Sequence, residues 1–175
     1  MSSIAKAKDK GPCAGVDQTT DPFGVKSRGT TLYVGYGNDL AVSLQQTGPD
    51  KHLQMLFFDQ GAVSAKVPAG TAGKVALADG TVLLFTSSKD AQPTASTDGT
   101  TIMTQRLVEF PLSQDALTAM AASPIAAVST EINGQPVFFN VPAKKAPKLQ
   151  AAASCLMIDQ QWIALCARPP QRGRP

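Results

Sequence analysis

Apolar and polar residues alternate with a period of two through much of the chain, and this pattern predicts a fold built mainly from β-strands. Four such runs, at residues 31–36, 40–44, 52–58 and 100–110, are separated by segments rich in glycine, proline and aspartate. These segments are typical of turns, because glycine permits backbone angles that other residues avoid and proline fixes φ and has no N–H to donate. Residues 88–99 are polar and turn-rich, and we expect them to form a loop.

Two further pairs of runs predict β-hairpins. Residues 74–78 and 81–87 flank Asp79-Gly80, and residues 125–132 and 137–141 flank Asn133-Gly134. The Asp-Gly pair suits a type I′ turn, in which both central residues need a positive φ. Pro136 has no N–H to donate, which favours an edge position for its strand.

Two helices are predicted beside these hairpins. Ser113 can cap a helix that runs to about residue 122, with Asp115 in its first turn, where a carboxylate complements the helix dipole. A second helix begins near Ala146, and Pro147 fits its first turn. Its apolar positions recur at helical spacing. They are Leu149, Ala152, Ala153 and Leu156.

Taken together, the elements predict an α+β fold: an antiparallel sheet or partly closed β-sandwich with two helices packed on one side. A chain of 175 residues with 43% hydrophobic content suits one domain, which we place at residues 29–167. Residues 158–167 fit either a terminal strand or a continuation of the helix. We expect residues 1–28 to be a flexible arm and residues 168–175 a disordered basic, proline-rich tail.

The net charge of +3 comes from the two ends of the chain. Residues 29–167 carry eight Lys and Arg against ten Asp and Glu. A nucleic-acid binder usually places basic residues on its folded body, so the charge pattern argues against nucleic acid as a partner. No apolar run approaches the ~20 residues needed to span a bilayer.

Each candidate catalytic or cofactor-binding motif lacks a residue or a secondary-structure element that its chemistry requires. His52 is the single histidine, which rules out a multi-histidine metal site. The glycines at 35 and 37 precede a predicted strand, whereas a dinucleotide loop must open a helix. The glycines at 70 and 73 lack the threonine or serine that a phosphate loop needs after its lysine. Glu109 and Glu131 could meet only if their strands were neighbours. We therefore predict no cofactor, and the sequence favours a non-enzymatic protein.

Two features indicate an interaction surface instead. Phe57-Phe58 and Phe138-Phe139 place adjacent rings on opposite faces of a strand, so one ring of each pair must be covered by another element or by a partner. We take Phe58 and Phe139 as the candidate surface rings. Lys144, Lys145 and Lys148 cluster at the start of the second helix, where cations oppose the dipole and could meet an anionic partner.

The three cysteines leave several arrangements open. Cys155 and Cys166 are the candidate disulfide, provided that the segment after the second helix doubles back. A bond between Cys13 and Cys155 would instead tie the N-terminal arm to the core. Without a disulfide, Cys155 would be a small buried hydrophobe.

The order of elements also carries a resemblance. The pieces that match are Asp21-Pro22-Phe23, residues 67–85, residues 110–125 and residues 151–156. In these the chain resembles a family of small exported bacterial domains of unknown function, with a β-rich body and a helix–hairpin–helix C-terminal part. The resemblance implies a periplasmic or surface protein, and implies no activity or ligand.

Three hypotheses of function follow. The first is a non-enzymatic exported domain that binds a protein or surface partner. The second is a small-ligand-binding protein or hydrolase whose site is not visible in the sequence. The third is a cytosolic regulatory or immunity-type module. No signal peptide is visible, so we expect a periplasmic or extracellular location if a signal was removed and a cytoplasmic location otherwise.

Overall fold

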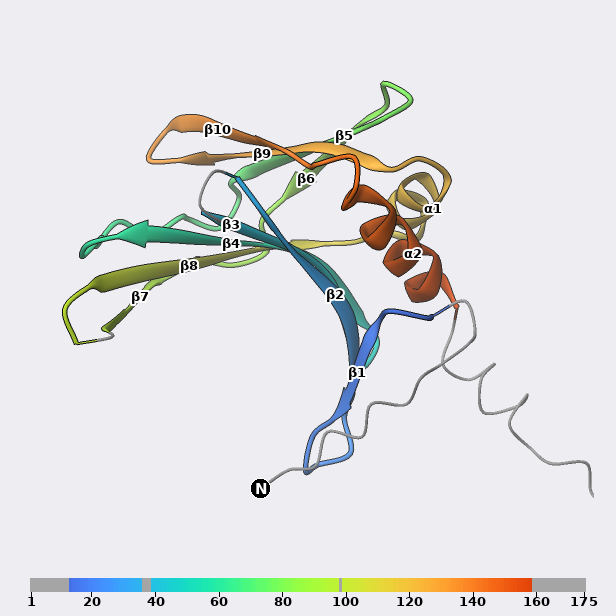
Figure 1. Cartoon of the computed structure of the whole chain (residues 1–175), viewed down its shortest axis with the longest axis horizontal. Helices are drawn as coiled ribbons and strands as arrows, with labels where there is room; N and C mark the ends of the chain where they lie inside the picture. Colours follow the sequence, from blue (N-terminus) through green and yellow to red (C-terminus); the bar gives the residue numbers. More distant parts are fainter. Residues whose placement is uncertain (1–12, 36–38, 98, 159–175) are drawn as a thin grey trace, which may run out of the picture.

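The computed structural model describes residues 13–35, 39–97 and 99–158, and it has an α+β architecture with two antiparallel sheets and two helices (Figure 1). Sheet A has the strand order β1-β2-β3-β4-β8-β7. Its strands are β1 (Asp17–Thr20), β2 (Lys26–Val34), β3 (Leu40–Thr47), β4 (Asp50–Gln60), β7 (Pro93–Thr97) and β8 (Ile102–Pro111). The predicted fold class is therefore confirmed.

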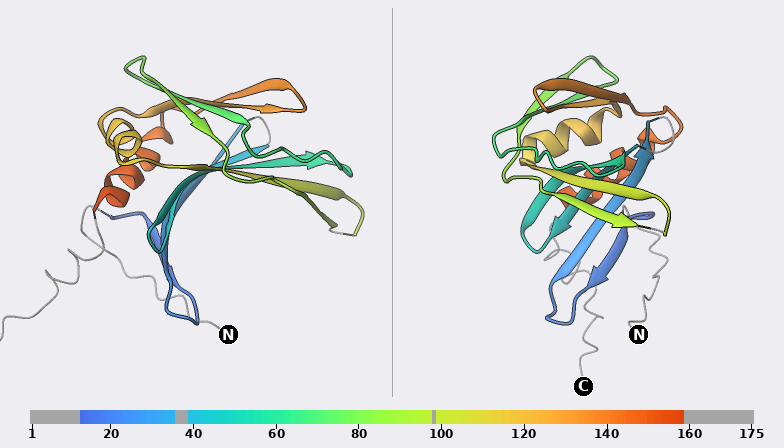
Figure 2. Two further views of the ribbon diagram at one scale, coloured as in Figure 1. Left: turned by 180° about the vertical axis from the view of Figure 1, so that it is seen from behind. Right: turned by 90° about the vertical axis from the view of Figure 1, so that its left-hand side faces the viewer.

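Sheet B has the order β10-β9-β5-β6. Its strands are β5 (Ala72–Leu77), β6 (Val82–Thr86), β9 (Ile125–Ile132) and β10 (Gln135–Asn140). The helices are α1 (Gln114–Ala122) and α2 (Ala146–Met157), which pack against each other and lie beside the bend in sheet A. Figure 2 shows that sheet B and both helices lie on the same side of sheet A.

The core fills the space between the two sheets and the helices. Every second side chain is buried through the middle of β4 and of β8, which is the period that the sequence displays in these strands. The largest fully buried side chains include Leu40, Leu44, Leu53, Met55, Phe110, Leu117, Met120, Ile125, Leu149 and Leu156. Phe110 of sheet A lies directly beneath Gly73 of sheet B, so this glycine sets how closely the sheets approach.

Local chemistry predicted the helix ends well. Ser113 caps α1 by accepting a hydrogen bond from the N–H of Ala116 at 3.1 Å. Pro147 lies in the first turn of α2. Pro136 lies on β10, which is an edge strand of sheet B.

The two hairpin turns differ from each other. Asn133 and Gly134 both have positive φ, 53° and 71°, as a two-residue type I′ turn requires. At the other hairpin Gly80 has φ 89° but Asp79 does not have a positive φ. There the N–H of Gly80 donates to the carbonyl of Leu77, and the N–H of Leu77 donates to Thr81. The type I′ prediction for Asp79-Gly80 is wrong, because this loop uses a longer turn closed by one left-handed glycine.

Residues 13–28 do not form the predicted flexible arm. β1 pairs with the start of β2 from Asp17↔Gly29 to Thr20↔Lys26, and the resulting hairpin extends from the body of the domain (Figure 1). The prediction failed because every residue of β1 is polar and exposed, so no apolar alternation marks the strand. The rest of the predicted arm and the tail at 168–175 lie outside the described residues, as do residues 159–167.

A similar failure occurs at residues 88–99, where the predicted loop contains β7. This strand is short, polar and mostly exposed, and among the described residues it pairs with β8 alone. Its conformation is decided by the partner strand, which a local pattern cannot reveal.

Candidate interaction surface

One face of sheet A is not covered by any described helix or strand, and we call it the outer face (Figure 1). Strand register places four residues in one row across it. The pairs are Tyr33↔Ala41, Ala41↔Leu56 and Leu56↔Leu107, which join β2, β3, β4 and β8. Tyr33 is 50% exposed and Leu107 is 37% exposed, while Leu56 is half-buried and Ala41 is buried between its larger neighbours. We call these four residues the outer row.

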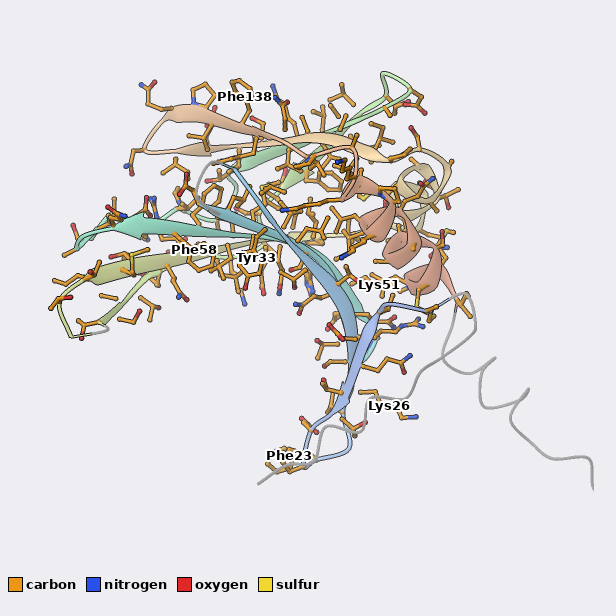
Figure 3. The ribbon with its side chains drawn as sticks, viewed as in Figure 1. Phe23, Lys26, Tyr33, Lys51, Phe58 and Phe138 are labelled. Carbon is orange, nitrogen blue, oxygen red and sulfur yellow. A yellow bond between two sulfur atoms is a disulfide. The ribbon has the colours of Figure 1, made fainter. Side chains whose placement is uncertain are left out.

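Phe58 extends the outer row. It lies two residues after Leu56 on β4 and therefore on the same face. Its ring centroid is 6.2 Å from that of Tyr33 with a tilt of 32°, which is within the range of favourable aromatic pairs. Figure 3 shows the two side chains together on the side of sheet A away from the helices. The structure thus places Phe58, a predicted surface ring, on the outer face.

A band of hydrogen-bonded polar groups runs beside the outer row. Ser43 Oγ donates to Gln54 Oε1 at 3.2 Å, and Gln54 Nε2 donates to Glu109 Oε1 at 2.8 Å. Lys89 Nζ lies 2.6 Å from Glu109 Oε2. Glu131 belongs to β9 of sheet B, so the two glutamates that the sequence singled out are not brought together. This band is a hydrogen-bonded polar border to the outer row.

Phe139 is a correction. Its side chain faces the interior, where its ring centroid is 6.1 Å from that of Phe57, and it packs against the core. The exposed ring of the pair is Phe138, at 72%, on the opposite face of sheet B. The sequence could establish that one ring faces outward. The choice between them depends on how β10 is registered on β9, which places Phe139 opposite the buried Val128.

The three lysines do not form one cluster of free charge. Lys145 is half-buried at the N-cap of α2, and its Nζ donates to the carbonyl of Tyr33 at 2.7 Å. This bond ties the start of α2 to β2. Lys144 and Lys148 are exposed at the same helix end.

The cysteine prediction is also corrected. Cys155 forms a disulfide with Cys13, across 142 residues of sequence, so it is not available to Cys166, which lies outside the described residues. The bond fastens the segment before β1 to the buried face of α2. Arg28 lies beside it, with Nη1 3.8 Å and 3.7 Å from the sulfurs of Cys13 and Cys155. The Cys13–Cys155 bond is the alternative pairing that the sequence left open.

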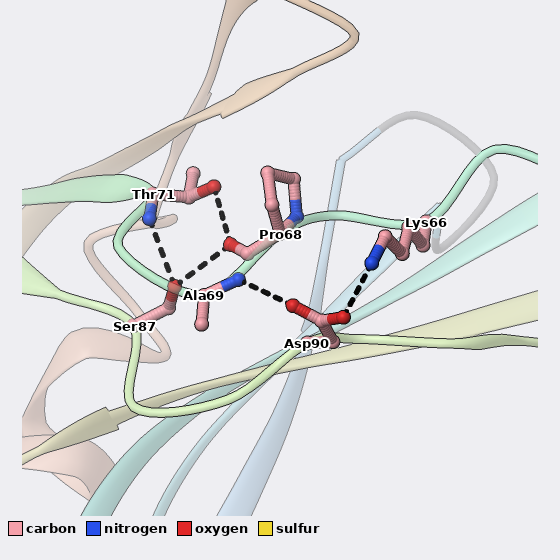
Figure 4. Close-up of polar contacts among 6 residues, drawn as sticks. All are labelled: Lys66, Pro68, Ala69, Thr71, Ser87 and Asp90. Carbon is pink, nitrogen blue, oxygen red and sulfur yellow. Dashed lines mark hydrogen bonds and ion pairs between the residues drawn. The ribbon is translucent and has the colours of Figure 1, made fainter.

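One polar cluster resembles a catalytic site in composition and is structural in its contacts (Figure 4). Ser87 Oγ accepts a hydrogen bond from the N–H of Thr71 at 3.0 Å and donates to the carbonyl of Pro68 at 3.2 Å. Its proton is thus directed at a backbone carbonyl, whereas a serine nucleophile needs a base within hydrogen-bond reach. The cluster joins the two segments that connect sheets A and B.

Asp90 belongs to the same polar cluster. Its carboxylate accepts hydrogen bonds from Lys66 Nζ at 2.5 Å and from the N–H of Ala69 at 2.8 Å. The bond from Lys66, which is the larger cause, and the bond from Ala69 both favour the ionised form. Together they hold the pKa of Asp90 below its ordinary value of 3.8.

Within residues 13–35, 39–97 and 99–158, no three His, Cys, Asp or Glu side chains gather closely enough to hold a metal ion. The surface hollows in this part of the chain include three with volumes of about 420, 420 and 310 Å³. His52 lines the smallest of them.

Comparisons with protein-family models, curated protein sequences and solved structures found no match to this chain. The resemblance to small exported bacterial domains therefore stays a prediction. In the part of the chain that the structure describes, no helix has the length and apolarity needed to cross a membrane.

Proposed function

We propose that this protein is a non-enzymatic binding domain that recognises a protein partner through the outer face of sheet A. The observation that carries the proposal is the outer row: apolar side chains from four strands, in register, on a face that no described element covers. Contiguous exposed apolar surface of this kind marks interaction sites in soluble proteins.

The face also has the composition of a binding site. Tyr33 presents a large apolar ring with a polar tip, the side-chain type enriched at the centre of interfaces. The strands that carry the outer row, β2, β3, β4 and β8, are neighbours within sheet A, so their backbone is already ordered. Binding should therefore cost little backbone entropy. The partner that fits is an apolar segment flanked by groups that can hydrogen-bond to the Gln54–Glu109 band.

The size of the face sets the expected strength of binding. Four strands at a spacing of ~4.8 Å span about 14 Å, well below the width of a standard interface that buries about 800 Å² per partner. We therefore expect a transient complex, unless the partner also contacts the N-terminal hairpin.

The hairpin offers such a contact. Phe23 is 91% exposed at its tip, and the loop that carries it is held by Asp21, whose Oδ1 accepts hydrogen bonds from the N–H groups of Phe23 and Val25 at 2.9 and 2.8 Å. A loop whose backbone is already ordered can present an exposed aromatic ring as an anchor, because less backbone entropy is lost when the partner binds.

We further propose that the protein acts in an exported compartment. The Cys13–Cys155 disulfide supports this location, because such bonds persist in oxidising compartments and are rare in the cytosol. Mass spectrometry of protein isolated from its natural source, alkylated without reduction, tests it. Free thiols at both cysteines would argue for the cytosol.

Site-specific photocrosslinking in the natural source tests the binding function. A benzoylphenylalanine at Tyr33 should give a discrete crosslinked protein, which Leu107→Glu should abolish. The same probe at Phe138, which is at least as accessible but lies on sheet B, should not give that product. An identical product at both positions, or none at Tyr33 in correctly folded protein, would overturn the outer face as the binding surface.

A further inference from the structure

Within the described residues each sheet ends in two edge strands, and these four edges are not equally protected. Soluble proteins blunt such edges with proline, charge or a polar surface, because unpaired N–H and C=O groups attract other strands. Of the three protected edges, β10 carries Pro136, β7 begins with Pro93, and β1 is polar and contains Asp17. The fourth edge, β6, reads Val82-Leu-Leu-Phe-Thr86 and has neither charge nor proline. Val82 and Leu84 are 56% and 74% exposed.

The ladder shows which groups of β6 are open. β6 pairs with β5 through Gly73↔Phe85 and Val75↔Leu83. Beyond the two ends of the strand, Ser87 donates to the carbonyl of Thr71, and Thr81 accepts from Leu77. The odd-numbered residues therefore turn their backbone groups toward β5. Alternation directs those of Val82, Leu84 and Thr86 at the open edge.

A hollow lies along this edge, and it decides what kind of strand can be added. Its volume is about 420 Å³, and residues 83–86 line it together with Pro111, Ser113, Asp115 and Ala116. A strand added to β6 would place alternate side chains over this hollow. The exposed carboxylate of Asp115 lies in its lining and would attract a cation there.

We propose that the β6 edge is a strand-addition site for an extended peptide segment of a partner protein. The segment has apolar or β-branched residues at alternate positions, one of which enters the hollow, and a lysine or arginine that pairs with Asp115. Its backbone hydrogen-bonds to Val82, Leu84 and Thr86. This mode of recognition takes affinity from the main chain and specificity from alternate side chains.

A second copy of this chain fits the site less well. Its own Leu83 and Phe85 are partly buried against its core, where the Phe85 ring centroid lies 6.3 Å from that of Phe110. Those side chains are not free to fill the hollow of the first copy. The site lies on sheet B and does not depend on the outer face of sheet A, so either proposal can fail alone.

The test uses the purified full chain, labelled with ¹⁵N, and a capped peptide of about eight residues that alternates valine and threonine and carries one lysine. We expect amide shift changes at Val82, Leu84, Thr86 and Asp115. The same peptide with N-methyl groups at alternate residues, which blocks strand pairing, should not bind. Binding that survives N-methylation, or shifts confined to β1, β7 or β10, would overturn the proposal.

Two matched proline variants examine the edge itself. Leu84→Pro removes an outward N–H and leaves the β5 ladder intact, so affinity should fall by about tenfold or more. Phe138→Pro makes the equivalent change on β10, in the same cross-sheet row, and should leave affinity unchanged. Equal loss in both variants would count against the site. So would a dimer in sedimentation that Leu84→Pro dissociates, because the occupant would then be a second copy.

Discussion

At the contact between Gly73 and Phe110, a single added methyl group should cause a measurable loss of stability. A Cβ atom added to the backbone of Gly73 would lie 2.5, 2.6 and 3.1 Å from three carbon atoms of the Phe110 ring. Carbon atoms in contact are normally 3.5–4.0 Å apart, so the ring or the strand must move by about 1 Å. Phe110 is fully buried and cannot move into solvent. Gly73→Ala should therefore cost about 1–3 kcal/mol of stability, as overpacking of a dense core does.

Urea unfolding followed by circular dichroism measures this cost, and a double-mutant cycle assigns it. Phe110→Leu alone should also destabilise, by about 1–2 kcal/mol, because it removes ring atoms from a filled site. In the double variant the smaller side chain makes room for the methyl group. The loss of stability in the double variant should therefore be smaller, by at least about 1 kcal/mol, than the sum of the losses in the two single variants. Additivity within about 0.5 kcal/mol would refute the reasoning, since it would mean that the two residues do not compete for the same space.

Three other changes test separate parts of the structure. Replacing both Cys13 and Cys155 with serine opens a loop of 142 residues and should cost about 2–5 kcal/mol in urea unfolding, whereas unchanged stability would contradict the bond. Ser113→Ala removes the cap of α1 and should cost about 1 kcal/mol, with Ser113→Asp as the variant that retains it. Asp90→Asn should lower the thermal midpoint at pH 7. Because the folded pKa of Asp90 is lowered, its contribution is present above about pH 4 and is lost as the pH falls through that pKa. The two midpoints should therefore converge as the pH falls below 3.8 and through the lowered pKa, and a constant gap would rule out the ionised carboxylate as the cause.

Much of the fold could be predicted because its signals are local. The cap at Ser113, the proline in the first turn of α2 and the Asn133-Gly134 turn each act over a few residues, where backbone geometry alone selects the side chain. The alternation in β4 and β8 is equally local in origin, since one face of each strand packs against the core.

The candidate site was less predictable. Phe58 was placed on a surface because two adjacent rings cannot both face one core, but Phe138 and Phe139 were assigned in the wrong order. Tyr33, Leu56 and Leu107 come from three strands, and no sequence pattern shows that they share a row. The open edge of β6 was missed for the same reason, because the sequence cannot show which strands lie at the end of a sheet.

The sequence by itself therefore determined the number and type of most elements, the start of both helices, the end of α1 and one of the two hairpin turns. These follow from propensities and caps that need no distant partner. Tertiary structure alone decided the pairing of β1 with β2 and of β7 with β8, the partner of Cys155, the ring of β10 that faces the core, and the faces and edges left open for a partner. Each of these depends on strand register or on contacts between residues far apart in the chain, where free energy gained elsewhere in the fold fixes the local choice.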